Sequence, residues 1–86
     1  MIAGPAFWDA EIAAAGWTRV TSPPPAMFPE TVARPSAWGR NFYTRGGQRL
    51  VMEWSDPVTL TAVLMNGLVQ PVETAEDLAA LIRRTG

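Results

Sequence analysis

The side chains that could do chemistry in this chain are arginines, carboxylates, hydroxyls and a single tyrosine. Its 86 residues include no histidine, no cysteine and no lysine. This composition removes the usual general base, the commonest metal ligands and the amine that forms Schiff bases. The carboxylates have neither calcium-loop spacing nor a glycine-rich cradle, and so short a chain has little room for the cleft that two-carboxylate glycoside hydrolysis needs. We therefore expect a protein that is not an enzyme and that binds no cofactor and no metal.

The arginines concentrate in the middle of the chain. Residues 17–52 hold five arginines against one acid, Glu30, for a net charge of +4, whereas residues 1–16 and 53–86 carry −2 and −3. Arginines beside an exposed tryptophan or tyrosine are typical of a surface that binds phosphate groups. The arginines placed for this are Arg40, Arg45 and Arg49, with Arg19 and Arg34 as further candidates, and the aromatic ring would come from Tyr43 or Trp38. The alternative is that they form only the solvated face of a hairpin.

A β-hairpin is the strongest local signal in the sequence. Two β-prone runs flank Gly46-Gly47, and glycine reaches the positive φ angles of tight hairpin turns without strain. Closing the turn at this pair sets Arg40 opposite Glu53, an opposite-charge pair that supports the register by about 0.2–1 kcal/mol. Because side chains alternate along a strand, one face carries Tyr43, Leu50, Met52 and Trp54. The other face carries Phe42, Thr44, Arg49 and Val51 together with the charged pair.

The rest of the chain predicts short elements around this hairpin. Asn66-Gly67 is the preferred dipeptide of a type I′ turn, and Thr74 with Asp77 forms a near-complete capping box at the start of a helix. The expected order is a helix over 5–15, a strand over 17–22, a Pro-rich loop over 23–37, the hairpin over 38–55, strands over 59–65 and 68–72, and a helix over 75–84. We therefore expect an α+β fold of one domain, in which a small antiparallel meander sheet of three to four strands packs against the N-terminal and C-terminal helices.

The Pro-rich loop, residues 23–37, is long for a domain of this size. It begins with Pro23-Pro24-Pro25 and carries Met27, Phe28 and Val32, which favours a course along the body of the protein. Long loops are often functional. Two interpretations stay open: the loop covers one face of the sheet, or it contacts a partner.

A protein-interaction surface is the function class that this composition favours. Helices on one side of a sheet leave the other face exposed unless a loop covers it, and contiguous exposed apolar surface usually marks a partner site. Four Trp and four Met are a high load for 86 residues, and these types are enriched at interfaces. Edge strands also allow strand addition or a homodimer. The expected partner-binding residues are Trp38, Arg40, Arg45, Arg49, Met27 and Phe28.

Binding of nucleic acid by the same arginines is the less favoured alternative. The helix–sheet–helix order resembles that of double-stranded-RNA-binding domains in topology alone. Those domains usually carry a lysine-rich start to the final helix, for phosphate contact. Here that position reads Thr74-Ala75-Glu76-Asp77, which is acidic and would repel phosphate.

Together these patterns predict a non-catalytic interaction protein that binds and occludes or bridges a protein partner, of the accessory or inhibitor kind found in phages and mobile elements. The alternatives are a nucleic-acid-binding regulator that uses the basic hairpin and a self-associating structural protein of the virion type. The N-terminus lacks the basic region and apolar run of a signal peptide, and no stretch approaches the roughly 20 apolar residues of a membrane span. We therefore expect a cytoplasmic protein of bacterial or phage type with no membrane partner.

Overall fold

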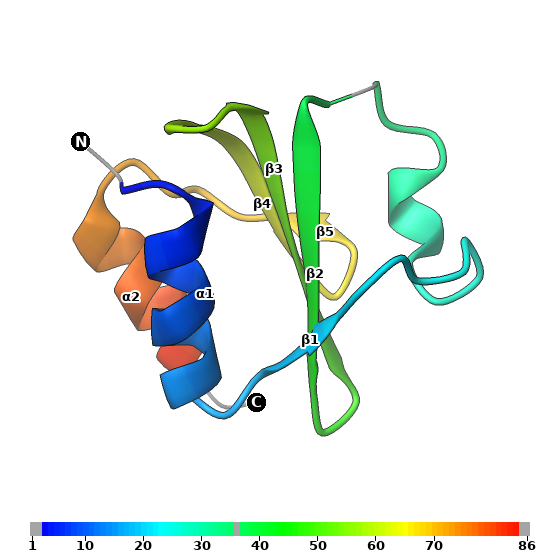
Figure 1. The fold of residues 1–86 in the computed structure, drawn as a ribbon. Helices are drawn as coiled ribbons and strands as arrows, with labels where there is room; N and C mark the ends of the chain where they lie inside the picture. Colours follow the sequence, from blue (N-terminus) through cyan, green and yellow to red (C-terminus); the bar gives the residue numbers. More distant parts are fainter. Residues whose placement is uncertain (1–2, 36, 85–86) are drawn as a thin grey trace.

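The chain folds as a five-stranded antiparallel sheet with two helices (Figure 1). The computed structural model describes residues 3–35 and 37–84. In chain order the elements are α1 (Pro5–Ala14), β1 (Thr18–Val20), the 3-10 helix η1 (Pro29–Thr31), β2 (Gly39–Arg45), β3 (Gln48–Asp56), β4 (Thr59–Met65), β5 (Leu68–Val69) and α2 (Ala75–Arg83). Each strand pairs with the next one along the chain. The expected α+β class with an antiparallel sheet is confirmed.

The sheet has five strands, which is more than the expected three to four. Both edge strands are short: β1 pairs with β2 over three residues, and β5 pairs with β4 over two. β1 ends at Val20 because the chain then turns, with a positive φ of 49° at Ser22. β5 ends shortly before Pro71, which has no N–H to offer a ladder. Both strands are therefore shorter than the segments 17–22 and 68–72 that the sequence indicates.

β2 and β3 form the predicted hairpin in the predicted register. The pairing closes with Arg45 opposite Gln48, around two glycines whose φ angles are 51° and 86°. β3 also pairs with β4, and the register shifts on either side of Trp54. A second tight turn at Asn66-Gly67, where both φ angles are positive, leads into β5. These turns are local features, which is why the sequence indicates them directly.

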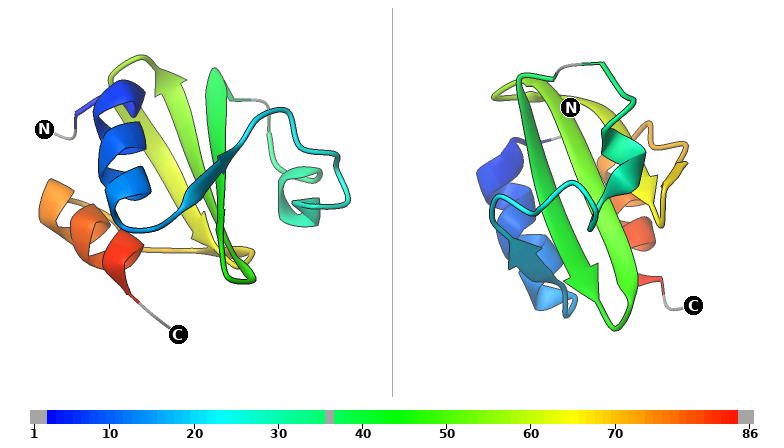
Figure 2. Two further views of the ribbon diagram at one scale, coloured as in Figure 1. Left: turned by 60° about the horizontal axis from the view of Figure 1, so that its bottom comes forward. Right: turned by 90° about the vertical axis from the view of Figure 1, so that its right-hand side faces the viewer.

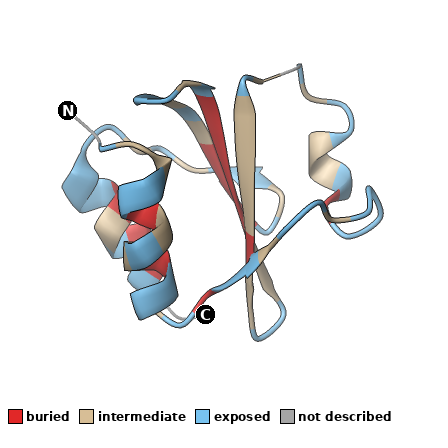
Figure 3. Cartoon of the chain, viewed as in Figure 1, coloured by how far each residue is buried: buried red, intermediate tan, exposed pale blue. Residues whose placement is uncertain are grey.

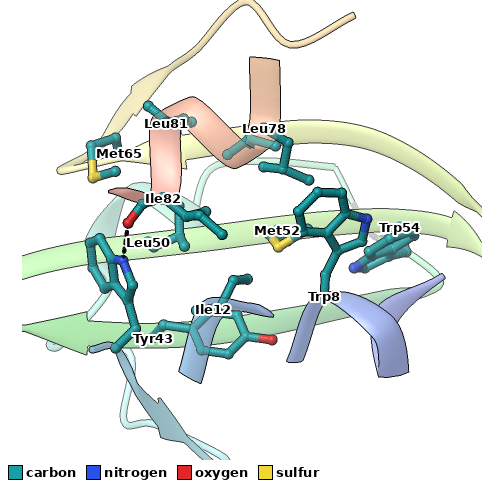
Figure 4. Packing of buried hydrophobic residues seen from close by; sticks show 12 residues of the cluster. Trp8, Ile12, Tyr43, Leu50, Met52, Trp54, Met65, Leu78, Leu81 and Ile82 are labelled. Carbon is teal, nitrogen blue, oxygen red and sulfur yellow. Dashed lines mark hydrogen bonds between the residues drawn. The ribbon is translucent and has the colours of Figure 1, made fainter. Parts of the chain in front are cut away.

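α1 and α2 lie side by side on one face of the sheet, called here the helix face (Figures 1 and 2). The buried side of each helix is turned toward the strands (Figure 3). Residues from both helices and from the central strands point toward one another in a single core (Figure 4). Its buried members are Trp8, Ile12, Trp17, Tyr43, Leu50, Met52, Trp54, Val63, Met65, Leu78, Leu81 and Ile82. Burial of this apolar surface is the main force that holds the fold together.

α2 begins with the cap that the sequence predicts. The hydroxyl of Thr74 accepts a hydrogen bond from the backbone N–H of Asp77, and the Asp77 carboxylate accepts one from the N–H of Thr74, both at 3.1 Å. Arg83 lies in the last turn, where the helix dipole favours a cation. In the part of the chain that the structure describes, no helix has the length and apolar character needed to cross a membrane.

The Pro-rich loop covers part of the opposite side of the sheet, called here the loop face (Figure 2). Its anchor is Phe28, which is only 1% exposed. Phe28 packs against Val51 and Leu64 in a second, smaller core, and its ring centre lies 4.9 Å from that of Phe42. At Phe28, therefore, the loop covers the sheet, which is the first of the two interpretations.

Candidate functional site

A buried carboxylate joins the Pro-rich loop to the loop face of the sheet. Glu53 of β3 is 5% exposed and lies on the same side of the strand as Val51. Arg34 of the loop holds both carboxylate oxygens: its Nε lies 2.8 Å from Oε2 and its Nη2 lies 2.8 Å from Oε1. Arg40 of β2, directly opposite Glu53 in the ladder, adds a bond of 2.8 Å from its Nε to Oε2. We call these three residues the Arg–Glu–Arg clamp.

The clamp also fixes the backbone of the loop. The Nη2 of Arg40 donates to the carbonyl oxygen of Pro35 at 2.7 Å. One guanidinium thereby holds both the buried carboxylate and the loop main chain. Hydrogen bonds between charged partners are roughly twice as strong as neutral ones, and a bidentate pair adds directionality. The loop is therefore attached to the sheet by Phe28, by the clamp and by an ion pair between Glu30 of η1 and Arg49 of β3.

The clamp carries an unbalanced positive charge. Burial alone would raise the pKa of Glu53, but the hydrogen bonds and charges of Arg34 and Arg40 outweigh burial and lower this pKa below its usual value. The hydrogen bond to Glu53 in turn raises the pKa of Arg34. Glu53 is therefore ionised at neutral pH, and an arginine guanidinium in a protein is always a cation. Two cations against one anion leave the clamp with a net charge of +1.

A surface cleft of about 380 Å³ lies beside the clamp. It is lined by Arg34, Pro35, Ala37, Trp38, Glu53, Trp54, Ser55 and Thr61. The cleft lies where the register between β3 and β4 shifts, and there the hydroxyl of Thr61 donates to the main-chain carbonyl of Glu53 at 3.0 Å. Trp38, just before β2, is 60% exposed. We call this site the Trp38 cleft.

Arg45 lies at the ends of the two helices. Its Nη1 donates to the carbonyl oxygens of Ala15 and Ile82, each at 3.0 Å. Its guanidinium lies 4.4 Å from the centre of the Trp17 ring, and it also donates to the side chain of Gln48. The negative ends of two helix dipoles and an aromatic face all favour a cation at this point. The donors of Arg45 are therefore used inside the domain, on the helix face.

The basic patch expected on the hairpin is divided between the two faces of the sheet. Arg40 and Arg49 lie on the loop face, whereas the third hairpin arginine lies on the helix face, because side chains alternate along a strand. Arg49 pairs with Glu30 of η1, with 3.4 Å between Nε and Oε1. Outside the hairpin, Arg19 pairs with Asp9. No continuous row of arginines results from these positions.

The six expected partner-binding residues fall into two groups. Trp38 and Met27 are exposed, at 60% and 41%, and Trp38 lines the cleft. The other four are engaged within the chain: Phe28 in the second core, Arg45 at the helix ends, and Arg40 and Arg49 in ion pairs. We therefore leave Phe28 and Arg45 out of the partner surface, since one is buried and the other has its donors occupied.

The sequence patterns do not place Arg34 or Glu53 among the partner-binding residues, and they indicate Arg34 only as a further candidate for the basic patch. The hairpin register does predict the ion pair between Arg40 and Glu53, which is one of the two ion pairs in the clamp. Arg34 carries no comparable signal, because it lies in an irregular loop whose course depends on long-range contacts. Only the fold brings its guanidinium to a carboxylate 19 residues away.

The lining of the Trp38 cleft includes a guanidinium, a carboxylate, two hydroxyls and two indoles, which bind through charge, hydrogen bonds and apolar contact. Within residues 3–35 and 37–84, no group of three or more acidic side chains is placed to hold a metal ion. Comparison of the chain with protein-family models, with curated proteins and with solved structures yields no match.

Proposed function

We propose that this chain is a non-catalytic protein-binding domain whose partner docks at the Trp38 cleft. The observation that carries the proposal is a tryptophan with 60% of its surface exposed beside a concave cleft. Tryptophan is highly buried on average. It is also the residue type most enriched among those that dominate binding energy, especially where it meets a pocket. A partner that fills the cleft would bury the exposed ring.

Two residues of the cleft lining, Arg34 and Glu53, are held in place before any partner arrives. The clamp fixes Arg34 and Glu53 through three hydrogen bonds of 2.8 Å. Trp38 is followed immediately by β2, and Arg40 anchors that strand two residues later. A surface that is already ordered loses less conformational entropy on binding. This order supports a specific interface.

The wider role that we propose is that of a small cytoplasmic accessory or inhibitor protein, of bacterial or phage type. Such a protein acts by occluding or bridging the surface of its partner. The composition supports this role, since the chain has no histidine, cysteine or lysine with which to perform common catalytic steps. Occupying a surface requires only shape, charge and apolar contact.

Affinity capture with matched variants tests the proposal. Wild-type protein, Trp38→Ala and Phe7→Ala are immobilised and exposed to host lysate, half of it treated with nuclease, and bound proteins are identified by mass spectrometry. Phe7 is the control because it is also an exposed aromatic residue, at 52%, but lies on α1. We expect wild type and Phe7→Ala to capture the same protein after nuclease treatment, and Trp38→Ala to lose it.

Three outcomes would overturn the proposal. Equal capture by Trp38→Ala would show that the cleft is not the docking site. Capture that disappears with nuclease would point to nucleic acid as the partner. Recovery of this chain alone, with a dimer mass in solution, would point to self-association.

A further inference from the structure

We propose that the Trp38 cleft binds an acidic side chain of the partner protein. In this arrangement Arg34 holds the partner's carboxylate, and a neighbouring apolar side chain of the partner packs on the ring of Trp38. This inference rests on the proposed function, because it names the chemistry of the segment that docks in the same cleft. The structural basis is the charge imbalance of the Arg–Glu–Arg clamp.

The clamp has one more positive charge than negative charge. Glu53 is the single acid among the described residues that line the cleft, and its two oxygens already accept three hydrogen bonds from arginines. Arg34 and Arg40 are both partly buried, with side chains 28% and 21% exposed. In such a setting charges are screened less than in water. A second carboxylate beside the clamp would make two anions for two cations.

Arg34 keeps a donor for that carboxylate. Its Nε and Nη2 are used on Glu53, while Arg40 uses Nε on Glu53 and Nη2 on the carbonyl of Pro35. A guanidinium carries five N–H groups. In the part of the chain that the structure describes, neither Nη1 has a hydrogen-bond partner. Since Arg34 lines the cleft, we assign its unused Nη1 as the donor for the partner's carboxylate.

The other residues that line the cleft determine which kind of partner residue fits next to the acidic one. Pro35, Ala37 and Trp38 are apolar neighbours of Arg34 along one edge of the cleft. A volume of about 380 Å³ is at the small end of ligand pockets and suits one or two side chains. The best match is an extended segment in which Asp or Glu lies next to an aromatic or aliphatic residue.

A protein carboxylate fits this surface better than a nucleic-acid backbone. Phosphate strands are bound by several cations in a row or groove. Here Arg19 and Arg49 are each paired with one acid, and Arg45 is committed to the helix ends. The surplus at the clamp is a single positive charge, and the chain as a whole carries −1. The geometry therefore favours a ligand with one localised negative charge.

Titration with two peptides tests the inference. Acetyl-Gly-Phe-Glu-Gly-amide and acetyl-Gly-Phe-Gln-Gly-amide differ only in the charge of one side chain, and both are added to the isotope-labelled full chain. Binding is followed by the NMR signals of the Trp38 indole N–H and the Arg34 Nε–H. We expect the Glu peptide to bind about ten-fold more tightly, which corresponds to about 1.4 kcal/mol. The difference should shrink as salt is added.

Charge-removing variants give the matched control. Arg34→Gln leaves Glu53 with Arg40 alone, so the clamp becomes neutral and the preference for the Glu peptide should disappear. Arg19→Gln also removes one positive charge, but from an exposed pair with Asp9, and should keep the preference. The dispersion of the amide signals in the NMR spectrum of each variant is the check that the variant is folded. If Arg34→Gln does not fold, the salt dependence of the wild-type titration decides.

The outcomes separate this inference from the proposed function. Equal affinity for the two peptides, or no shift with either at millimolar concentration, would overturn recognition of an acidic side chain. A short oligo-deoxythymidine strand that shifts the Trp38 and Arg34 signals more than the Glu peptide does would also overturn it. In either case, loss of the captured protein in Trp38→Ala would still support the cleft as the docking site.

Discussion

The two faces of the sheet are covered in different ways. On the helix face, the two helices and the strands bury twelve of the described residues in one apolar core. On the loop face, the smaller core holds three buried residues among those described, Phe28, Val51 and Leu64. The loop is otherwise attached by the Arg–Glu–Arg clamp and by the ion pair between Glu30 and Arg49. Stability scales with buried apolar area, so the helix face supplies most of it. The loop face has a weaker and more polar attachment, and it is there that the cleft lies.

This difference separates the part that stabilises the fold from the part that we propose as the docking site. Segments with few buried apolar contacts open at lower free energy than the whole domain does. Binding sites are often carried by such loops on a rigid scaffold. In this domain β3 belongs to both regions, because its residues alternate between the two faces. Matched substitutions in the two faces therefore test the comparison directly.

The largest effect is expected from truncating a leucine of the helix face. Leu50 and Leu64 are 0% and 2% exposed, in neighbouring central strands, but they face opposite sides. Leu50→Ala should lower the free energy of unfolding by about 4 kcal/mol, and Leu64→Ala by about 2 kcal/mol, because a loop relaxes around a cavity more easily than packed helices do. Urea unfolding of both variants measures the difference. Equal losses would show that the two faces are equally well packed.

A smaller and more local effect is expected from Phe28→Ala. This change removes the apolar anchor of the Pro-rich loop, and we expect it to lower the free energy of loop opening by about 2 kcal/mol. Amide hydrogen exchange is the measurement. The N–H of Thr31, which donates to the carbonyl of Phe28, should lose protection, whereas amides of β3 should continue to exchange through global unfolding. A uniform loss of protection in both places would instead make the loop part of one cooperative unit.

The smallest effect is the pH dependence that the clamp gives to the loop face. The pKa of Glu53 is lower in the folded chain than its unfolded value near 4.5, so its contribution to stability is fully present above that value. It is lost as the pH falls through the folded-state pKa, because the unfolded state then binds more protons. Urea midpoints of wild type should therefore fall more steeply than those of Glu53→Gln below about pH 4.5. All other carboxylates are present in both proteins, so the difference belongs to Glu53. Identical slopes would mean that the clamp adds no stability.

Much of the fold follows from local sequence signals. The Gly-Gly turn and the strand alternation around it give the hairpin and its register, and Thr74 with Asp77 gives the start of α2. Each of these signals lies within a few residues of the structure that it determines. The number of strands is less well determined, because β1 and β5 pair over only three and two residues. Such short edges depend on their neighbours more than on their own propensity.

The candidate site is less predictable for the same reason. Trp38 is indicated by its residue type, and the pairing of Arg40 with Glu53 follows from the hairpin register. The position of Arg34 and the burial of Phe28 depend on how the Pro-rich loop crosses the sheet, and no local pattern determines that path. Strand alternation alone does argue against one continuous basic patch, since it places the three hairpin arginines on two different faces of the sheet.

The position of Arg45 has a consequence for the order of folding. The hairpin that carries Arg45 closes through neighbouring residues, and such structures form within microseconds. The carbonyl partners of Arg45 are 30 residues before it and 37 residues after it, at the ends of α1 and α2. Each of these two hydrogen bonds can therefore form only after the helix that carries its carbonyl has docked. Contacts that form after the transition state act mainly by slowing unfolding. We therefore expect the hydrogen bonds from Arg45 to the two helix ends to form late in folding and to prolong the lifetime of the folded domain.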